Sequence, residues 1–145
     1  MATLRGMNRQ EKIIAHLQKD AFAEQLGAKL VEVKPGYSRI ALTVRSDMVN
    51  FHGITHGGVV FGLADMAFAA ASNSRGQTAV ALNMSISFLN ATQIGDHLEA
   101  VAEEQHQGGP IALYDIVVMR QPDGELIAKL QAMVYRKKEW FVAPE

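Results

Sequence analysis

The sequence predicts an α+β domain in which an antiparallel sheet of about five or six strands wraps around one long buried helix. Residues 59–71 are apolar on almost every face, and a helix without a polar face belongs in a protein core. Runs with a period of two, typical of half-buried strands, lie on both sides of this segment. Because short turns join several of these runs, neighbouring strands are expected to be antiparallel.

The N-terminal segment is predicted to be a helix over residues 8–27. Asn8 can cap it, with Glu11 three residues later, and Gly27 is a plausible end. Its apolar residues recur at helical spacing and are Ile13, Ile14, Leu17 and Ala21. We assign residues 1–27 to an N-terminal helical segment packed on the domain and residues 28–145 to the sheet and its helix, a single domain overall.

The strands follow from alternation and from turn residues. Pro35-Gly36 separates two runs that form a hairpin, and Pro122-Asp123-Gly124-Glu125 separates two more. The predicted strands cover residues 29–34, 37–45, 78–90, 97–107, 111–120 and 126–138.

The strand over residues 78–90 has two different faces. One is expected to carry Val80, Leu82, Met84, Ile86 and Phe88, and the other Ala79, Ala81, Asn83, Ser85 and Ser87. The second face is too polar for a deep core and suits a second subunit or a ligand. Met66, Phe68, Met84 and Phe88 are expected in the core.

Composition excludes several classes of function. With 48% apolar and 20% charged residues, the 145-residue chain is an ordinary globular protein. It has no cysteine, which excludes disulfides, thiolate metal sites and a cysteine nucleophile. A net charge of −1 gives no overall attraction to nucleic acid or to an anionic membrane.

The chain carries no sequence signal for a membrane or for a metal. Its first residues lead into a polar stretch rather than a signal-peptide core, and the apolar run of residues 59–71 is too short to cross a bilayer. We therefore expect a cytoplasmic protein with no membrane partner. A metal site is not expected, because His52 and His56 lack a third ligand at a useful spacing.

One carboxylate, Asp65, interrupts the apolar helix. An ionised carboxylate in such a place is costly unless it is paired, hydrogen-bonded or used. His56-Gly57-Gly58 stands at the start of the same helix. This pair of features is the main indication of function.

The region resembles the hotdog-fold acyl-CoA thioesterases, in particular the PaaI-type branch of the phenylacetate pathway. The resemblance covers roughly residues 21–136 and centres on the run from Asn50 to Gly58 followed by Asp65. It implies a hotdog fold and hydrolysis of an acyl-CoA, with an aryl-acetyl or medium-chain acyl group, to free acid and CoA. It also implies a homodimer with shared active sites or a homotetramer made of two dimers. No separate cofactor is expected, because CoA is part of the substrate.

The resemblance also implies roles for particular residues. Asp65 is the expected catalytic carboxylate, and Gly57 offers its backbone N–H to the thioester carbonyl. Asn50 and His56 shape the site and hold the substrate or the attacking water. Some relatives have a further polar contact on the strand after the helix, for which Ser85 is the first candidate and Asn83 the second.

Further substrate contacts are predicted around these residues. Gly58, like Gly57, has no side chain to keep a ligand from the first turn of the helix, where unpaired N–H groups favour a developing oxyanion. Phe61 is a candidate for the acyl pocket. Arg75, Arg136 and Lys137 could hold the phosphates of CoA.

Helix geometry adds a prediction of its own. Gly57 and Asp65 are eight residues apart, which is about 12 Å along one helix. A nucleophile or base and an oxyanion donor must both lie roughly 3 Å from the reacting atoms. Asp65 therefore cannot easily serve the Gly57 of its own chain, and we predict a shared site at a twofold interface.

Two other functions fit the same fold. One is a non-catalytic acyl-CoA-binding or sensing protein, for which the segment before the first strand is too short to add DNA binding. The other is a hotdog dehydratase or hydratase, which needs a His and a carboxylate at a spacing that His56 and Asp65 do not provide.

Overall fold

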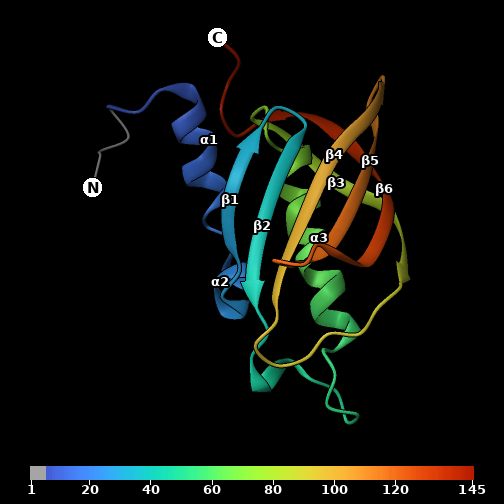
Figure 1. Cartoon of the computed structure of the whole chain (residues 1–145). Helices are drawn as coiled ribbons and strands as arrows, with labels where there is room; N and C mark the ends of the chain where they lie inside the picture. Colours follow the sequence, from blue (N-terminus) through green and yellow to red (C-terminus); the bar gives the residue numbers. More distant parts are fainter. Residues whose placement is uncertain (1–5) are drawn as a thin grey trace.

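The computed structural model describes residues 6–145 and confirms the predicted arrangement of one antiparallel sheet around one buried helix (Figure 1). The sheet has six strands in the order β1-β2-β4-β5-β6-β3, so β1 and β3 are its two edges. The helices are α1 (Arg9–Leu17), α2 (Ala21–Leu26) and α3 (Gly57–Ser72), with a short 3-10 helix, η2, at Ser46–Met48. The strands are β1 (Lys29–Lys34), β2 (Tyr37–Thr43), β3 (Gln77–Phe88), β4 (His97–Gly108), β5 (Ile111–Gln121) and β6 (Glu125–Trp140).

The predicted N-terminal helix is two helices, which corrects the sequence prediction. Asn8 caps α1 as expected, and Gly27 ends α2 in the left-handed conformation with φ +70°. Between them the chain leaves the helix, and the Asp20 side chain accepts a hydrogen bond of 3.0 Å from the amide of Ala23. Aspartate is a poor interior helix residue and a strong N-cap, so Asp20 starts a second helix instead of continuing the first.

A bulge in β3 corrects the prediction for its two faces. The pairing with β6 shifts register between Ala81 and Asn83. Each strand residue points opposite to the one before it, so one extra residue exchanges the faces beyond it. Val80 and Leu82 therefore point away from the core, while Met84 and Ile86 pack against it.

The core lies between α3 and the concave face of the sheet. Leu63, Ala67 and Phe68 of α3 are fully buried there, and the Phe68 ring meets the ring of Tyr114 edge-on at 5.5 Å. The sheet covers most of α3, as the nearly all-apolar sequence predicts. One narrow stripe stays open, formed by Gly58, the half-buried Asp65 and the exposed Ala69.

No helix within residues 6–145 combines the length and the apolar character needed to cross a membrane.

Candidate active site

The first turn of α3 presents one free backbone amide. His56 is the N-cap, and its Nδ1 accepts a hydrogen bond of 2.9 Å from the amide of Gly58. The amide of Val59 donates to the carbonyl of His56 at 2.9 Å. Among residues 6–145 no acceptor takes the amide hydrogen of Gly57. The Gly57 N–H is therefore the donor that this helix end leaves for a ligand.

An aromatic side chain lies against this free amide. A Cβ added at Gly57 would be 3.3 Å from the ring of Phe88, so glycine keeps the approach open. Phe88 is 55% exposed and not the core residue that the sequence predicts. It is the last residue of β3, where it supplies an apolar wall beside the Gly57 N–H.

Asp65 has no partner for its charge. It is half-buried in the open stripe of α3, and no residue of 6–145 donates a hydrogen bond to it or forms an ion pair with it. Burial raises the pKa of the Asp65 carboxyl, and the negative charge of Asp20 raises it further. A desolvated, unpaired carboxylate is a stronger base than a solvated one, which suits a proton acceptor.

Asn50 organises the loop that precedes α3. Its Oδ1 accepts hydrogen bonds from the amides of His52, at 2.9 Å, and Ile54, at 3.4 Å. This is the backbone role that short amide side chains often have in turns. Its amide nitrogen makes no hydrogen bond to residues 6–145 and remains available to a substrate or a water.

Gly57 and Asp65 lie in one unbroken helix, α3. The structure therefore has the helical spacing from which the shared site was predicted. Along α3 the two residues are about 12 Å apart. The single chain thus places its candidate oxyanion donor and its candidate base too far apart to act on the same carbonyl.

The other predicted substrate contacts are not gathered beside Asp65. Phe61 is partly buried and packs against the core. Asn83 and Ser85 pair with Met133 and Gln131 of β6, on the face of the sheet that points away from α3. Contact of Asn83 or Ser85 with a substrate stays a prediction that the single chain does not support.

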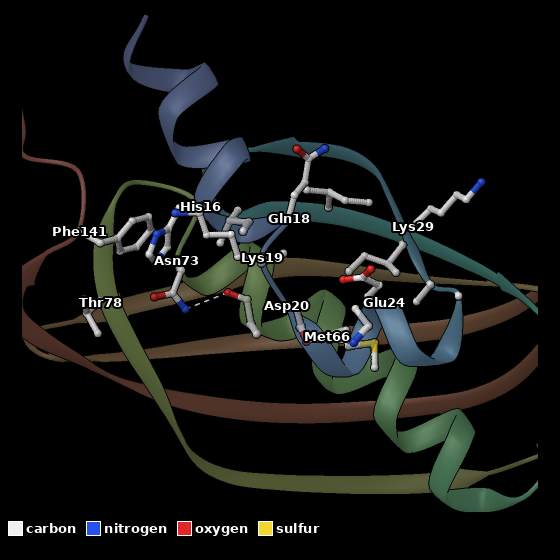
Figure 2. Close-up of a pocket in the computed structure, with 18 residues that line it drawn as sticks. His16, Gln18, Lys19, Asp20, Glu24, Lys29, Met66, Asn73, Thr78 and Phe141 are labelled. Atoms are coloured by element: carbon white, nitrogen blue, oxygen red, sulfur yellow. Dashed lines mark hydrogen bonds between the residues drawn. The ribbon is translucent and has the colours of Figure 1, made fainter. Parts of the chain in front are cut away.

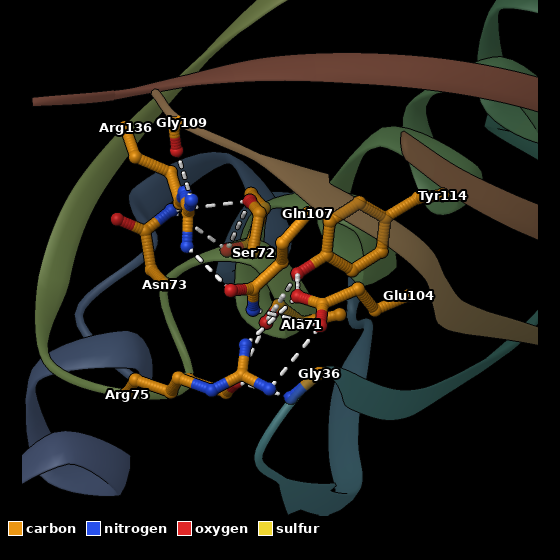
Figure 3. Close-up of polar contacts among 12 residues, drawn as sticks. Gly36, Ala71, Ser72, Asn73, Arg75, Glu104, Gln107, Gly109, Tyr114 and Arg136 are labelled. Carbon is orange, nitrogen blue, oxygen red and sulfur yellow. Dashed lines mark hydrogen bonds and ion pairs between the residues drawn. The ribbon is translucent and has the colours of Figure 1, made fainter. Parts of the chain in front are cut away.

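Two of the predicted phosphate ligands, Arg75 and Arg136, lie near the C-terminal end of α3 and are already engaged (Figure 3). Arg75 forms a two-pronged ion pair with Glu104, with its shorter contact at 2.8 Å. The buried Tyr114 hydroxyl donates to the same carboxylate at 2.8 Å. The Arg136 guanidinium donates to Gln107 and to the carbonyl of Gly109. Arg75 therefore serves the fold first, and among residues 6–145 only the backbone carbonyl of Lys137, not its side chain, takes part in such a contact.

A cavity that the sequence prediction did not include opens along the second half of α3, from Met66 onward (Figure 2). It has a volume of about 840 Å³ and lies between α1, α2, the first hairpin and the second half of α3. Asp20 is one of its lining residues. Phe22 of α2 packs on Gly62 of α3, where an added Cβ would be 3.4 Å from the Phe22 ring. The sequence could have identified Asp20 as an N-cap, because it precedes an apolar stretch. The cavity could not be predicted in this way, because it forms where elements distant in the sequence pack together.

A model of the thioesterase superfamily matches residues 52–127, more than half of the chain. The chain belongs to the thioesterase superfamily. This thioesterase is 41% identical over 107 residues to the acyl-coenzyme A thioesterase PaaI of Escherichia coli, covering 74% of this chain and 76% of that protein. The structure of E. coli PaaI, from the phenylacetic acid degradation operon, matches with a TM-score of 0.85 and 34% identity, covering 92% of this chain and 99% of that one.

A solved structure with a ligand also matches the thioesterase. The smu.793 protein of Streptococcus mutans, bound to acetyl CoA, has a TM-score of 0.72 and 27% identity, covering 76% of this chain and 88% of that one. The hotdog fold and the family predicted from the sequence are thereby confirmed, as is the assignment to a class of thioester-hydrolysing enzymes.

Proposed function

We propose that this thioesterase hydrolyses acyl-CoA to a free carboxylic acid and CoA, at sites that two subunits share. The observation that carries the proposal is the unpaired, half-buried Asp65 in the same helix as the free Gly57 N–H, about 12 Å from it. Two α3 helices packed antiparallel along their open stripes bring Asp65 of one subunit to Gly57 of the partner subunit. The similarity to acyl-CoA thioesterases and to an acetyl-CoA-bound protein supports the substrate class.

In the proposed reaction the partner subunit's Gly57 donates its N–H to the thioester carbonyl oxygen. Asp65 either removes a proton from water, whose oxygen then attacks the carbonyl carbon, or attacks that carbon itself to form an anhydride that water opens. The C–S bond breaks as the tetrahedral intermediate collapses, and the CoA thiolate leaves and takes up a proton. The oxyanion gains its stabilisation from a preorganised amide at a helix N-terminus.

Two surfaces are proposed for assembly. The free edge of β3 and the open stripe of α3 form the dimer contact, because the shared site lies there. The outer face of β3 and β6 carries a second apolar patch, which is formed by Val80, Leu82, Met133 and Tyr135. We assign this patch to the contact between two dimers.

The test is release of free thiol from a panel of aromatic, short-chain and medium-chain acyl-CoAs. The wild-type enzyme is expected to turn over at least one class, and Asp65→Asn, which keeps the side-chain shape, is expected to lose most of the activity, on the order of 100-fold or more. Gel filtration of Asp65→Asn checks that the assembly survives. An active Asp65→Asn enzyme contradicts the role of Asp65, and tight binding without turnover by the wild type favours the sensing function.

A further inference from the structure

The loop before α3 holds an aromatic side chain out in solvent. Phe51 is 92% exposed, and it stacks on His52 with ring centroids 4.3 Å apart. The loop is nevertheless well ordered, because the amide of Asn50 donates to the carbonyl of Ile54 at 2.8 Å and the amide of Gly53 donates back to Asn50 at 2.9 Å. These hydrogen bonds hold Phe51 in an exposed position, where its ring is available to a second subunit.

The cavity along the second half of α3 has mainly apolar walls and an open side. Leu17, Ala23, Leu30 and Met66 are among its lining residues (Figure 2). Its α3 wall includes the exposed Ala69, one helical turn after Asp65. From the level of Met66 to that of Asn73, which also lines it, the cavity follows α3 for about 10 Å. Its volume of about 840 Å³ is that of a small-molecule pocket.

The proposed shared site fixes which parts of the two subunits lie level with each other. If Gly57 faces Asp65 of the partner subunit in both directions, the twofold axis passes at Phe61. Residues of α3 at equal distances on either side of Phe61 then lie opposite one another, so Ala69, which follows Asp65, lies level with the part of the partner subunit that extends beyond its Gly57. Figure 1 shows the loop of residues 50–54 projecting beyond the N-terminal end of α3. The loop of each subunit therefore falls beside the cavity of the other.

We propose that Phe51 of the partner subunit closes this cavity and completes an acyl-binding pocket that begins at Met66, the residue after Asp65. This inference rests on the shared site proposed above. The acyl group lies along Met66 and Ala69, and the partner's Phe51 covers it from the open side. Each active site thus takes its carboxylate and cavity from one chain, and its oxyanion donor and lid from the other.

The first experiment measures acyl preference. Phe51→Ala is expected to lower the ratio of kcat/KM for octanoyl-CoA to that for acetyl-CoA roughly tenfold, because the longer chain loses an apolar wall. Val31→Ala, which shortens another exposed apolar side chain on the edge strand β1, is the matched control and should leave the ratio unchanged. An unchanged ratio in Phe51→Ala overturns the proposal.

The second experiment asks in which subunit Phe51 acts. Asp65→Asn and Gly57→Pro subunits are combined, so that neither parent dimer has a working site and only the hybrid has one. Proline is suited to the first helical position, removes the N–H, and fits after His56, whose ψ is 135°. Phe51→Ala is then added to one subunit or to the other. The ratio should fall only when Phe51→Ala is on the Asp65→Asn subunit, which supplies the amide and the lid.

The outcomes separate the two proposals. If the hybrid of Asp65→Asn and Gly57→Pro subunits, without Phe51→Ala, has no activity, both the shared site and the proposed role of Phe51 are overturned. An active hybrid in which Phe51→Ala acts only on the Gly57→Pro subunit, or acts on neither, overturns the lid alone.

Crosslinking gives a readout that does not depend on activity. Because the chain has no cysteine, Phe51→Cys and Ala69→Cys can be introduced singly and mixed. A disulfide-linked dimer is expected in the oxidised mixture and in neither variant alone, and its absence contradicts the placement of Phe51.

Discussion

Among single residues, the proposed chemistry depends mainly on Asp65. Its carboxylate is half-buried and unpaired, and burial and the charge of Asp20 both raise its pKa. Folding therefore makes the ionised form of Asp65 less stable than it would be in water. No contact within the chain compensates for this cost, as expected for a residue retained for function. Its exposed fraction keeps that cost small, since solvent screens it.

Asp20 should set the lower end of the pH range for activity. In the proposed reaction Asp65 acts in its ionised form, so activity is expected to rise as pH increases through the pKa of its carboxyl. Asp20→Asn removes a neighbouring negative charge, lowers that pKa, and should move the acid limb of kcat/KM to lower pH. Asparagine is also a good N-cap, so α2 is retained.

The control for this prediction is Glu24→Gln, also on the rim of the cavity. The charge of Glu24 is not among the causes of the Asp65 pKa shift, so its removal should leave the acid limb in place. Equal shifts in both variants would indicate a general charge effect and not a specific one from Asp20.

The sequence was a good guide where a residue's neighbours in the chain decide its environment. The positions of Asp65 inside an apolar helix and of Gly57 in its first turn were predicted correctly from the sequence pattern. Phe88 could not, because its exposure depends on where β3 ends beside α3. Arg75 looked like a free cation until β4 brought Glu104 to it.

At the scale of elements, the start of α3 matters most. His56 ends the preceding loop, caps the helix through Nδ1, and leaves the amide of Gly57 unpaired. A Cβ at Gly58 would come within 3.1 Å of that same nitrogen, so the second glycine is needed for the cap. Within the chain, His56 is therefore a positioning residue for the oxyanion donor.

Replacing His56 tests this role. His56→Ala should lower the free energy of unfolding by about 1 kcal/mol, because the cap is lost, and should reduce kcat as the Gly57 amide becomes mobile. His56→Asn retains a capping oxygen and should restore both. Thermal or urea unfolding and thiol-release kinetics are the measurements. Restored stability without restored kcat would show that His56 contacts the substrate directly.

Elements were predicted best where turn residues mark their ends. Gly36 and Gly124 lie at hairpin turns with positive φ, and both hairpins are present. The break before α2 and the bulge in β3 were missed for different reasons. The break before α2 could have been predicted from Asp20, which is a strong N-cap residue. The bulge could not, because it depends on how β6 pairs with β3, which the alternation of apolar and polar residues does not encode.

In the molecule as a whole, large apolar side chains are exposed on two neighbouring strands, β3 and β6. β3 is a sheet edge and is mostly exposed on both faces, which is a hazard for a monomer and an opportunity for an oligomer. The fold of the single chain could be predicted from its own sequence pattern. One chain does not form a complete active site, because half of each proposed site belongs to a second copy.

The patch of Val80, Leu82, Met133 and Tyr135 should hold two dimers together without contributing to catalysis. Val80 and Tyr135 are directly paired across β3 and β6 and are 41% and 43% exposed. Val80→Lys places a charge in this contact, and burying an unpaired charge costs far more than a side-chain contact supplies. The variant should therefore be a dimer by light scattering, with kcat/KM per subunit within about twofold of the wild type. Gln131→Lys, on the same face but outside the patch, should remain a tetramer. Loss of activity together with dissociation would mean that the active site spans the patch, in conflict with sites built along α3.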